Sequence, residues 1–196
     1  MTYDVIHLIE NAALIDDLEY SRLIDQCEQI YRYCADRTLC GTQEILTFSD
    51  RVTCISTGKA SWPGEEAFIR KGSDSESASK RVYFRRALDE IARRQEQRSA
   101  DWMILIIYTG GCVKRSKRKV FNNWLWEIDT PVLEFAVATE HADEMFLDSF
   151  SDPVLVCETL PKSPMIEKLE QIDDMFLFLT EYYAEQAEYA GLYCMQ

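Results

Sequence analysis

The chain has 196 residues, 47% of them hydrophobic, and a formal net charge of −13. This length suits one globular domain with a sizeable core, and we expect residues 1–196 to form it. The negative charge argues against nucleic acid as a partner. No apolar run approaches the roughly 20 residues of a membrane span, and the chain starts without a basic region, so we expect neither membrane insertion nor secretion.

Cysteine usage points to a reducing compartment. The seven cysteines are an odd number and form no Cys-x-x-Cys pair, a pattern typical of reduced thiols. We therefore expect a cytoplasmic protein. His7 and His141 are the two histidines, and neither stands at zinc-ligand spacing from a cysteine. We expect no metal and no other cofactor.

The charges are unevenly distributed. Residues 70–119 hold 14 Lys or Arg and 6 Asp or Glu, a net charge of +8, so the remainder carries −21. This asymmetry predicts a basic face on an acidic body. For residues 80–98, a solvated helix surface is an equally good interpretation.

Hydrophobic spacing predicts alternating strands and helices. In the first half we expect a strand at 5–9, a helix at 18–35 with Asp16 or Asp17 as its N-cap, a hairpin of strands 44–48 and 52–56, and a helix at 81–97. In the second half we expect strand 102–108, helix 120–127, strand 132–138, a short helix 142–150, strand 153–157 and a long helix from 164 to about 190.

These elements predict an α/β fold: a doubly wound, mostly parallel sheet of six strands, with one antiparallel edge strand and helices on both faces. The strands at 5–9 and 102–108 are continuously apolar, so we place them side by side at the centre of the sheet. The apolar residues of the last helix, from Ile166 to Tyr183, recur at helical spacing, and we expect them to form core.

The ends of the two central strands mark the expected functional edge, because open parallel sheets bind ligands beyond the carboxyl ends of their strands. The first strand runs into Glu10-Asn11-Ala12 and the fourth into Thr109-Gly110-Gly111, and the hairpin contains Thr47-Phe48. Together with the order of elements, this placement resembles the von Willebrand factor A (vWA) domain over nearly the whole chain. The resemblance implies a Rossmann-like fold, a protein-binding role, and a divalent metal held by Asp-x-Ser-x-Ser and Thr-Asp-Gly motifs at these strand ends.

Most oxygen ligands of that metal site are missing here. Glu10 stands at the position of the first Asp, whereas Ala12 and Leu14 replace the two serines and Gly110 replaces the second Asp. The family's loop threonine would fall near residues 82–83 and is also absent. Mg²⁺ needs near-octahedral oxygen ligands, so we expect a degenerate site without metal. We expect the Glu10 carboxylate to cap a helix N-terminus or to pair with a basic residue.

A basic run, Lys114-Arg115-Ser116-Lys117-Arg118-Lys119, follows the fourth strand. Its cations could hold a carboxylate- or phosphate-bearing surface through charge-assisted hydrogen bonds. A solvated loop and a nuclear-targeting signal are alternatives that the pattern leaves open.

Cys112 and Arg118 fit the Cys-x5-Arg pattern of protein tyrosine phosphatases. That chemistry needs a thiol of lowered pKa and a loop whose N–H groups point at one phosphate. The loop has no glycine, and neither a preceding His nor a general acid can be assigned. Because the Cys-x5-Arg pattern is present but its usual surroundings are missing, a small cysteine-dependent hydrolase or phosphatase using Cys112 and Arg118 is kept as the alternative function.

The first hypothesis is a non-enzymatic protein-interaction (adaptor) module of vWA type that has lost its metal. No Ser/His/Asp arrangement and no glycine-rich phosphate loop can be assembled from the sequence. We expect a protein partner with an acidic contact surface. The predicted partner-binding residues are Glu10, Asn11, Ala12, Thr109, Gly110, Gly111, Lys114, Arg115, Lys117 and Arg118.

Overall fold

The computed structural model describes residues 1–12, 15–49, 51–58, 61–68, 84–111, 113–148, 150, 154–155 and 163–193. The strands are β1 (Tyr3–Glu10), β2 (Cys40–Phe48), β3 (Val52–Thr57), β4 (Trp102–Thr109), β5 (Val132–Ala138) and β6 (Val154–Leu155). The helices are α1 (Asp17–Ala35), η1 (Glu65–Phe68), α2 (Phe84–Gln95), η2 (Arg115–Lys117), α3 (Arg118–Glu127), α4 (Glu144–Leu147) and α5 (Pro164–Tyr193). Each predicted element has a counterpart, although residues 81–83, 153 and 156–157 lie outside the described ranges.

The six described strands form one sheet in the order β3-β2-β1-β4-β5-β6. Every neighbouring pair is parallel except β2 and β3, which pair antiparallel at the edge. The predicted mostly parallel sheet with one antiparallel edge strand is confirmed. The predicted central pairing is confirmed as well, because Val5 of β1 lies opposite Ile104 of β4 and Leu8 lies opposite Ile107.

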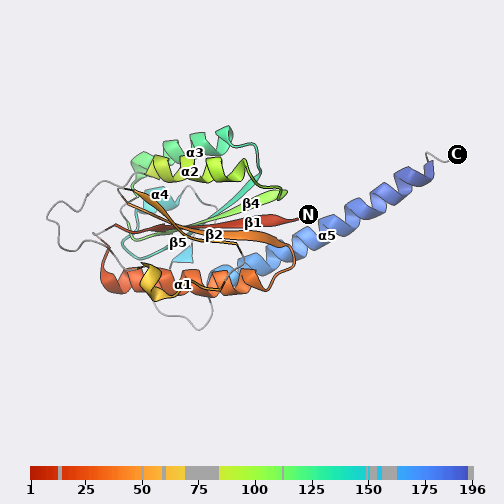
Figure 1. Cartoon of the computed structure of the whole chain (residues 1–196). Coiled ribbons are helices and arrows are strands. Elements are labelled where there is room, and N and C mark those ends of the chain that lie inside the picture. Colours follow the sequence, from red (N-terminus) through yellow and green to blue (C-terminus); the bar gives the residue numbers. More distant parts are fainter. Residues whose placement is uncertain are drawn as a thin grey trace.

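Helices cover both faces of the sheet (Figure 1), so β1 and β4 are buried on both sides. Successive side chains of a strand point to opposite faces. Val5 therefore packs with Leu23 of α1 and Leu169 of α5, whereas Ile6 packs on the other face with Leu88 of α2 and the helices α3 and α4. This two-sided burial explains why both central strands have continuously apolar sequences.

Capping residues decide where two helices begin. The Asp16 carboxylate accepts hydrogen bonds from the N–H groups of Leu18 and Glu19 at 2.8 and 3.4 Å, which confirms it as the N-cap of α1. Asp143 similarly accepts from the N–H of Phe146 at 3.2 Å. The helix predicted at 142–150 is therefore wrong in its extent: α4 begins after Asp143 and is one turn long.

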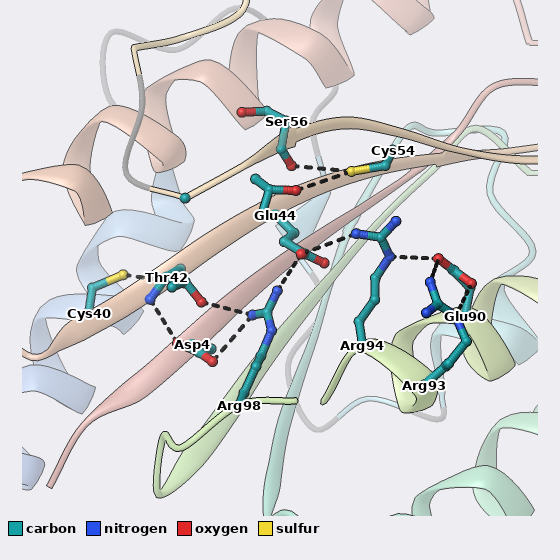
Figure 2. A network of polar contacts seen from close by, with 12 residues as sticks. Asp4, Cys40, Thr42, Glu44, Cys54, Ser56, Glu90, Arg93, Arg94 and Arg98 are labelled. Atoms are coloured by element: carbon teal, nitrogen blue, oxygen red, sulfur yellow. Dashed lines mark hydrogen bonds and ion pairs between the residues drawn. The ribbon is translucent and has the colours of Figure 1, made fainter. Parts of the chain in front are cut away.

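Arginines of α2 and its following turn bind carboxylates at the amino end of the sheet (Figure 2). Arg98 lies 3.2 Å from an oxygen of Asp4 in β1 and 2.6 Å from an oxygen of Glu44 in β2. Arg94 lies 3.2 Å from the same Glu44 oxygen. For Arg94 and Arg98, both interpretations of residues 80–98, a basic face and a solvated surface, are therefore wrong. Buried carboxylates need such partners, and this need draws the arginines inward.

Helix α5 is only partly core. Its first turns bury Met165, Leu169 and Phe176 against the sheet, but Met175 and Tyr183, both predicted as core, are exposed. Thirty residues give a helix of about 45 Å, and Figure 1 shows that its second half continues past the body of the domain. No helix in the described ranges, α5 included, is long and apolar enough to cross a membrane.

Candidate functional site

β1 and β4 end side by side at the carboxyl edge of the sheet. β1 pairs with β2 on one side and with β4 on the other, so the strand order reverses between β1 and β4. Glu10 is the last residue of β1, and Thr109 is the last residue of β4. The two predicted segments thus meet where open α/β sheets bind their ligands.

The buried carboxylate of Glu10 is bound by the end of β4. Its Oε2 accepts hydrogen bonds from the Thr109 hydroxyl at 2.7 Å and from the Gly110 N–H at 3.0 Å. The Thr109 hydroxyl itself accepts from the N–H of Gly111 at 3.3 Å. Both donors to Glu10 belong to the end of β4, so these two bonds link the end of β1 to the end of β4. The pairing of Glu10 with a helix N-terminus or a basic residue, expected from the sequence, stays a prediction.

The two glycines after β4 are closely packed. A Cβ atom at Gly110 would lie 2.6 Å from a side-chain carbon of Ile15, well inside van der Waals contact. Gly111 has φ of +102°, and a Cβ there would lie 2.1 Å from the carbonyl oxygen of His141. Neither position has room for a side chain. At Gly110, the space that a side chain would need is filled by Ile15.

Half of the predicted partner-binding residues are buried in this arrangement. They are Glu10, Ala12, Thr109, Gly110 and Gly111. Asn11 is half-buried, and its N–H donates to the carbonyl oxygen of Phe48 at 2.9 Å. These residues therefore form the interior of the carboxyl edge. The groups that face solvent there belong to the loop that follows β4.

The exposed part of the edge is the basic loop, residues 114–119. Lys114, Arg115 and Arg118 are exposed, and Lys117 is half-buried. The loop is fixed against the segment that follows β5: the N–H of Arg115 donates to the Asp143 carboxylate at 3.2 Å, and the Arg118 guanidinium donates to the Asp148 carbonyl at 3.3 Å. Its backbone position is therefore defined while its cationic groups face outward.

An open pocket of about 390 Å³ lies beside this loop. It is lined by Arg115, Arg118, Lys119, Asn122 and Asn123. All five side chains carry N–H donors and three are cationic, a set that can bind a carboxylate or phosphate group. The sequence indicated the two arginines but missed both asparagines. The signal was their position on the helix predicted at 120–127, four and five residues beyond Arg118.

A second polar cluster at this edge was also missed from the sequence. Nδ1 of His141 hydrogen-bonds Oε1 of Glu19 at 2.6 Å, and this bond raises the pKa of His141. Glu140 adds a further carboxylate, so that ligand atoms of the three residues lie within 4.8 Å of one another. Such a set could accept a divalent cation. The bond between Glu19 and His141 accounts for the arrangement without one.

Several predicted site residues lie outside the described ranges. They include Leu14, Cys112 and residues 82–83. The phosphatase alternative therefore keeps Cys112 as a prediction. Its other member, Arg118, begins α3 and donates to a backbone carbonyl oxygen.

No protein-family profile and no curated protein matches the sequence, but solved structures do. BatB from Bacteroides thetaiotaomicron superimposes with a TM-score of 0.54 over 92% of this chain and 100% of its own, at 10% identity. The VWA domain of SpRpn10 gives a TM-score of 0.52 over 84% of this chain and 90% of its own, at 13% identity. The chain has the von Willebrand factor A fold. The resemblance inferred from the strand ends is confirmed at the level of the fold.

The vWA2 paralog of ArnB from Sulfolobus acidocaldarius gives a TM-score of 0.52 at 11% identity over 80% of this vWA chain. The chain spans 42% of that protein and 90% of the SpRpn10 domain. At identities this low, the superpositions establish a common fold and nothing about function. The role of each domain depends on its own residues.

The residues that the structure describes at this vWA edge do not fit the metal that the fold family implies. Ala12 offers no side-chain oxygen and is buried, and Ile15 occupies the space that an aspartate at Gly110 would need. The Glu10 carboxylate is engaged by Thr109 and Gly110. One carboxylate without the hydroxyl ligands falls far short of the near-octahedral oxygen set of Mg²⁺.

Proposed function

We propose that this vWA domain is a non-enzymatic protein-interaction module that has lost the metal and binds an acidic group of its partner through the basic loop. The observation that carries the proposal is the contrast at one edge. Glu10, where the family would place a metal ligand, is bound internally by Thr109 and Gly110, whereas the cations of the loop face solvent. Interaction is the role that the vWA resemblance implies.

The chemistry of the partner follows from the lining of the pocket. Arg115, Arg118 and Lys119 are cationic, and residues 110–125 contain no Asp or Glu. A carboxylate or phosphate placed there would be met by several charge-assisted donors. These cations would then supply the positive charge that a metal supplies in other vWA domains. Such electrostatic recognition acts strongly on association rate and specificity.

A cytoplasmic location is part of the proposal. It is supported by the cysteines, because Cys27, Cys34 and Cys40 are free thiols buried in the core. Burial raises the pKa of the Cys27 and Cys34 thiols, which keeps them protonated and unreactive.

The test is a double charge reversal, Arg115→Glu with Arg118→Glu. A partner is captured from the native cell with the wild-type domain, and its affinity for both proteins is measured at low and at high salt. We expect the variant to bind more weakly, with the larger difference at low salt, where screening is least. Folding should be nearly unchanged, since exposed substitutions usually alter stability by no more than about 0.5 kcal/mol.

The matched control is Arg32→Glu with Arg93→Glu, which makes the same change in net charge on α1 and α2. Both side chains are exposed and form only surface ion pairs. If the control weakens binding as much as the test variant, net charge and not the basic loop attracts the partner. If the partner binds the test variant with unchanged affinity at low salt, the proposed site is wrong.

A further inference from the structure

The second half of α5 presents large apolar side chains to solvent. Leu177, Phe178, Tyr182 and Tyr183 are all exposed, with Phe178 at 66%. They follow Phe176, the last fully buried residue among those of α5 up to residue 184, whose burial the structure describes. Figure 1 shows that the second half of α5 continues past the body. Soluble domains expose single apolar residues freely, but a group on successive helical turns marks an interaction surface.

One face of this segment combines acids with aromatic rings. Asp174, Phe178, Glu181 and Tyr182 stand at i, i+4, i+7 and i+8, so they share a face of the helix, here called the acidic stripe. The Phe178 and Tyr182 rings stack with centroids 6.5 Å apart. Residues 169–196 contain six Asp or Glu and no Lys or Arg. Two such helices would repel each other, so the stripe requires a basic surface opposite.

The outer face of α3 has the complementary chemistry. Lys119, Asn122, Asn123 and Trp126 share one exposed side of the helix, here called the α3 outer face, opposite the buried Trp124. Trp126 is 91% exposed. Its indole ring offers a large apolar contact, and the pocket beside Lys119 supplies cationic donors. Tryptophan is enriched among the residues that dominate interface energetics.

We propose that the acidic stripe of one copy docks on the α3 outer face of a second copy. Phe178 and Tyr182 would pack against Trp126, while Asp174 and Glu181 would face Lys119. A molecule cannot make this contact with itself, because α3 and α5 pack on opposite faces of the sheet (Figure 1). The association is therefore head to tail, with different surfaces on the two partners.

The contact is expected to be weak and reversible. A stable interface buries at least about 1,200 Å², and two crossing helix faces provide less. The net charge of −13 on each copy opposes association as well. Self-association should therefore be visible only at high protein concentration. The α3 outer face shares Lys119, Asn122 and Asn123 with the pocket of the proposed function. The aromatic variants of the test leave Arg115, Arg118 and Lys119 intact, so the two proposals can fail separately.

The test uses sedimentation equilibrium over a wide concentration range. We expect the mass of the wild-type protein to rise above the 22.8 kDa of one chain as concentration increases. Trp126→Ala and Phe178→Ser should each weaken association about tenfold. Leu18→Ala, which removes an exposed apolar side chain from α1, should leave it unchanged.

The decisive arm is a mixture of the two defective variants. Trp126→Ala retains an intact acidic stripe and Phe178→Ser retains an intact α3 outer face, so an equimolar mixture should recover one contact and stop at a 1:1 dimer. A charge-swapped pair, Lys119→Glu with Glu181→Lys, provides a second version: each variant alone should associate less, and mixing the two should restore association. Circular dichroism checks that every variant is folded.

Three results would overturn the inference. The first is a wild-type protein that stays at the mass of one chain throughout the range. The second is self-association that both aromatic variants leave unchanged. The third is sensitivity to Phe178→Ser without sensitivity to Trp126→Ala and without recovery on mixing, which would mean that two α5 helices pair with each other.

Discussion

The buried histidine of β1 makes a specific prediction about acid stability. His7 is fully buried, and its Nε2 lies 3.1 Å from the side-chain oxygen of Gln43 while its Nδ1 lies 2.9 Å from the Tyr108 hydroxyl. Since an amide oxygen can only accept, Nε2 carries the proton and Nδ1 accepts from Tyr108. The site thus holds a neutral imidazole. Burial lowers the pKa of His7 from 6.5 to about 4, against the smaller opposing effect of the Gln43 hydrogen bond.

The sign of the effect follows from proton linkage. Between pH 6.5 and 4, the unfolded chain binds a proton at this position and the folded chain does not. Stability therefore falls as the pH is lowered through that window. The difference in pKa predicts a loss of about 2 kcal/mol between about pH 7.5 and pH 5 from His7 alone.

Urea unfolding of the wild type and of His7→Gln across this pH range measures the loss. The glutamine removes the titrating group, so its free energy of unfolding should fall less steeply toward pH 5 than that of the wild type. His141 has the opposite sign, because the Glu19 hydrogen bond raises its pKa and the resulting stability is lost as pH rises through that raised value. Both proteins retain it, so its contribution cancels. A difference between the two proteins that stays constant from pH 7.5 to pH 5 would refute the reasoning.

Three other outcomes are expected. Arg98→Met should lower the free energy of unfolding by about 3–5 kcal/mol in urea, because it leaves the buried Asp4 without its cation and Glu44 with Arg94 alone. The exposed Arg93→Met should cost under about 1 kcal/mol, and equal costs would contradict the burial argument. Gly111→Ala should cost more than about 1 kcal/mol and more than Gly58→Ala, which shares the positive φ but has open space around it; equal costs would mean that the close contact is relieved. Millimolar Mg²⁺ should not raise the melting temperature in a thermal scan, and a rise abolished by Glu10→Ala would show that a metal site is complete after all.

The secondary structure and the sheet could be predicted because their signals are local. The run at 102–108 is apolar at every position, as expected for a strand covered on both faces, and it forms the central strand β4. Asp16 precedes an amphipathic repeat, and its carboxylate caps α1 as expected. The helix predicted at 142–150 failed because the capping by Asp143 starts the helix later than the apolar pattern suggests.

The candidate site was predictable only in part. Parallel strands that pair must end at the same edge, so the meeting of Glu10 with Thr109 followed from the topology. The filling of the space at Gly110 by Ile15 did not follow, because it depends on how the chain after β1 folds back. The asparagines of the pocket were missed for a similar reason: their contribution depends on which side of α3 faces outward.

The sequence by itself determined the order of elements and the identity of the central strands, because these depend on hydrophobic periodicity and on runs that are apolar at every position. The tertiary structure alone decided which distant charges meet. Arg98 binds Asp4, and His141 binds Glu19, across more than 90 residues of chain in each case. It also decided where α5 leaves the core: a helix takes its length from local sequence, whereas burial along it ends where the packed face of the sheet ends.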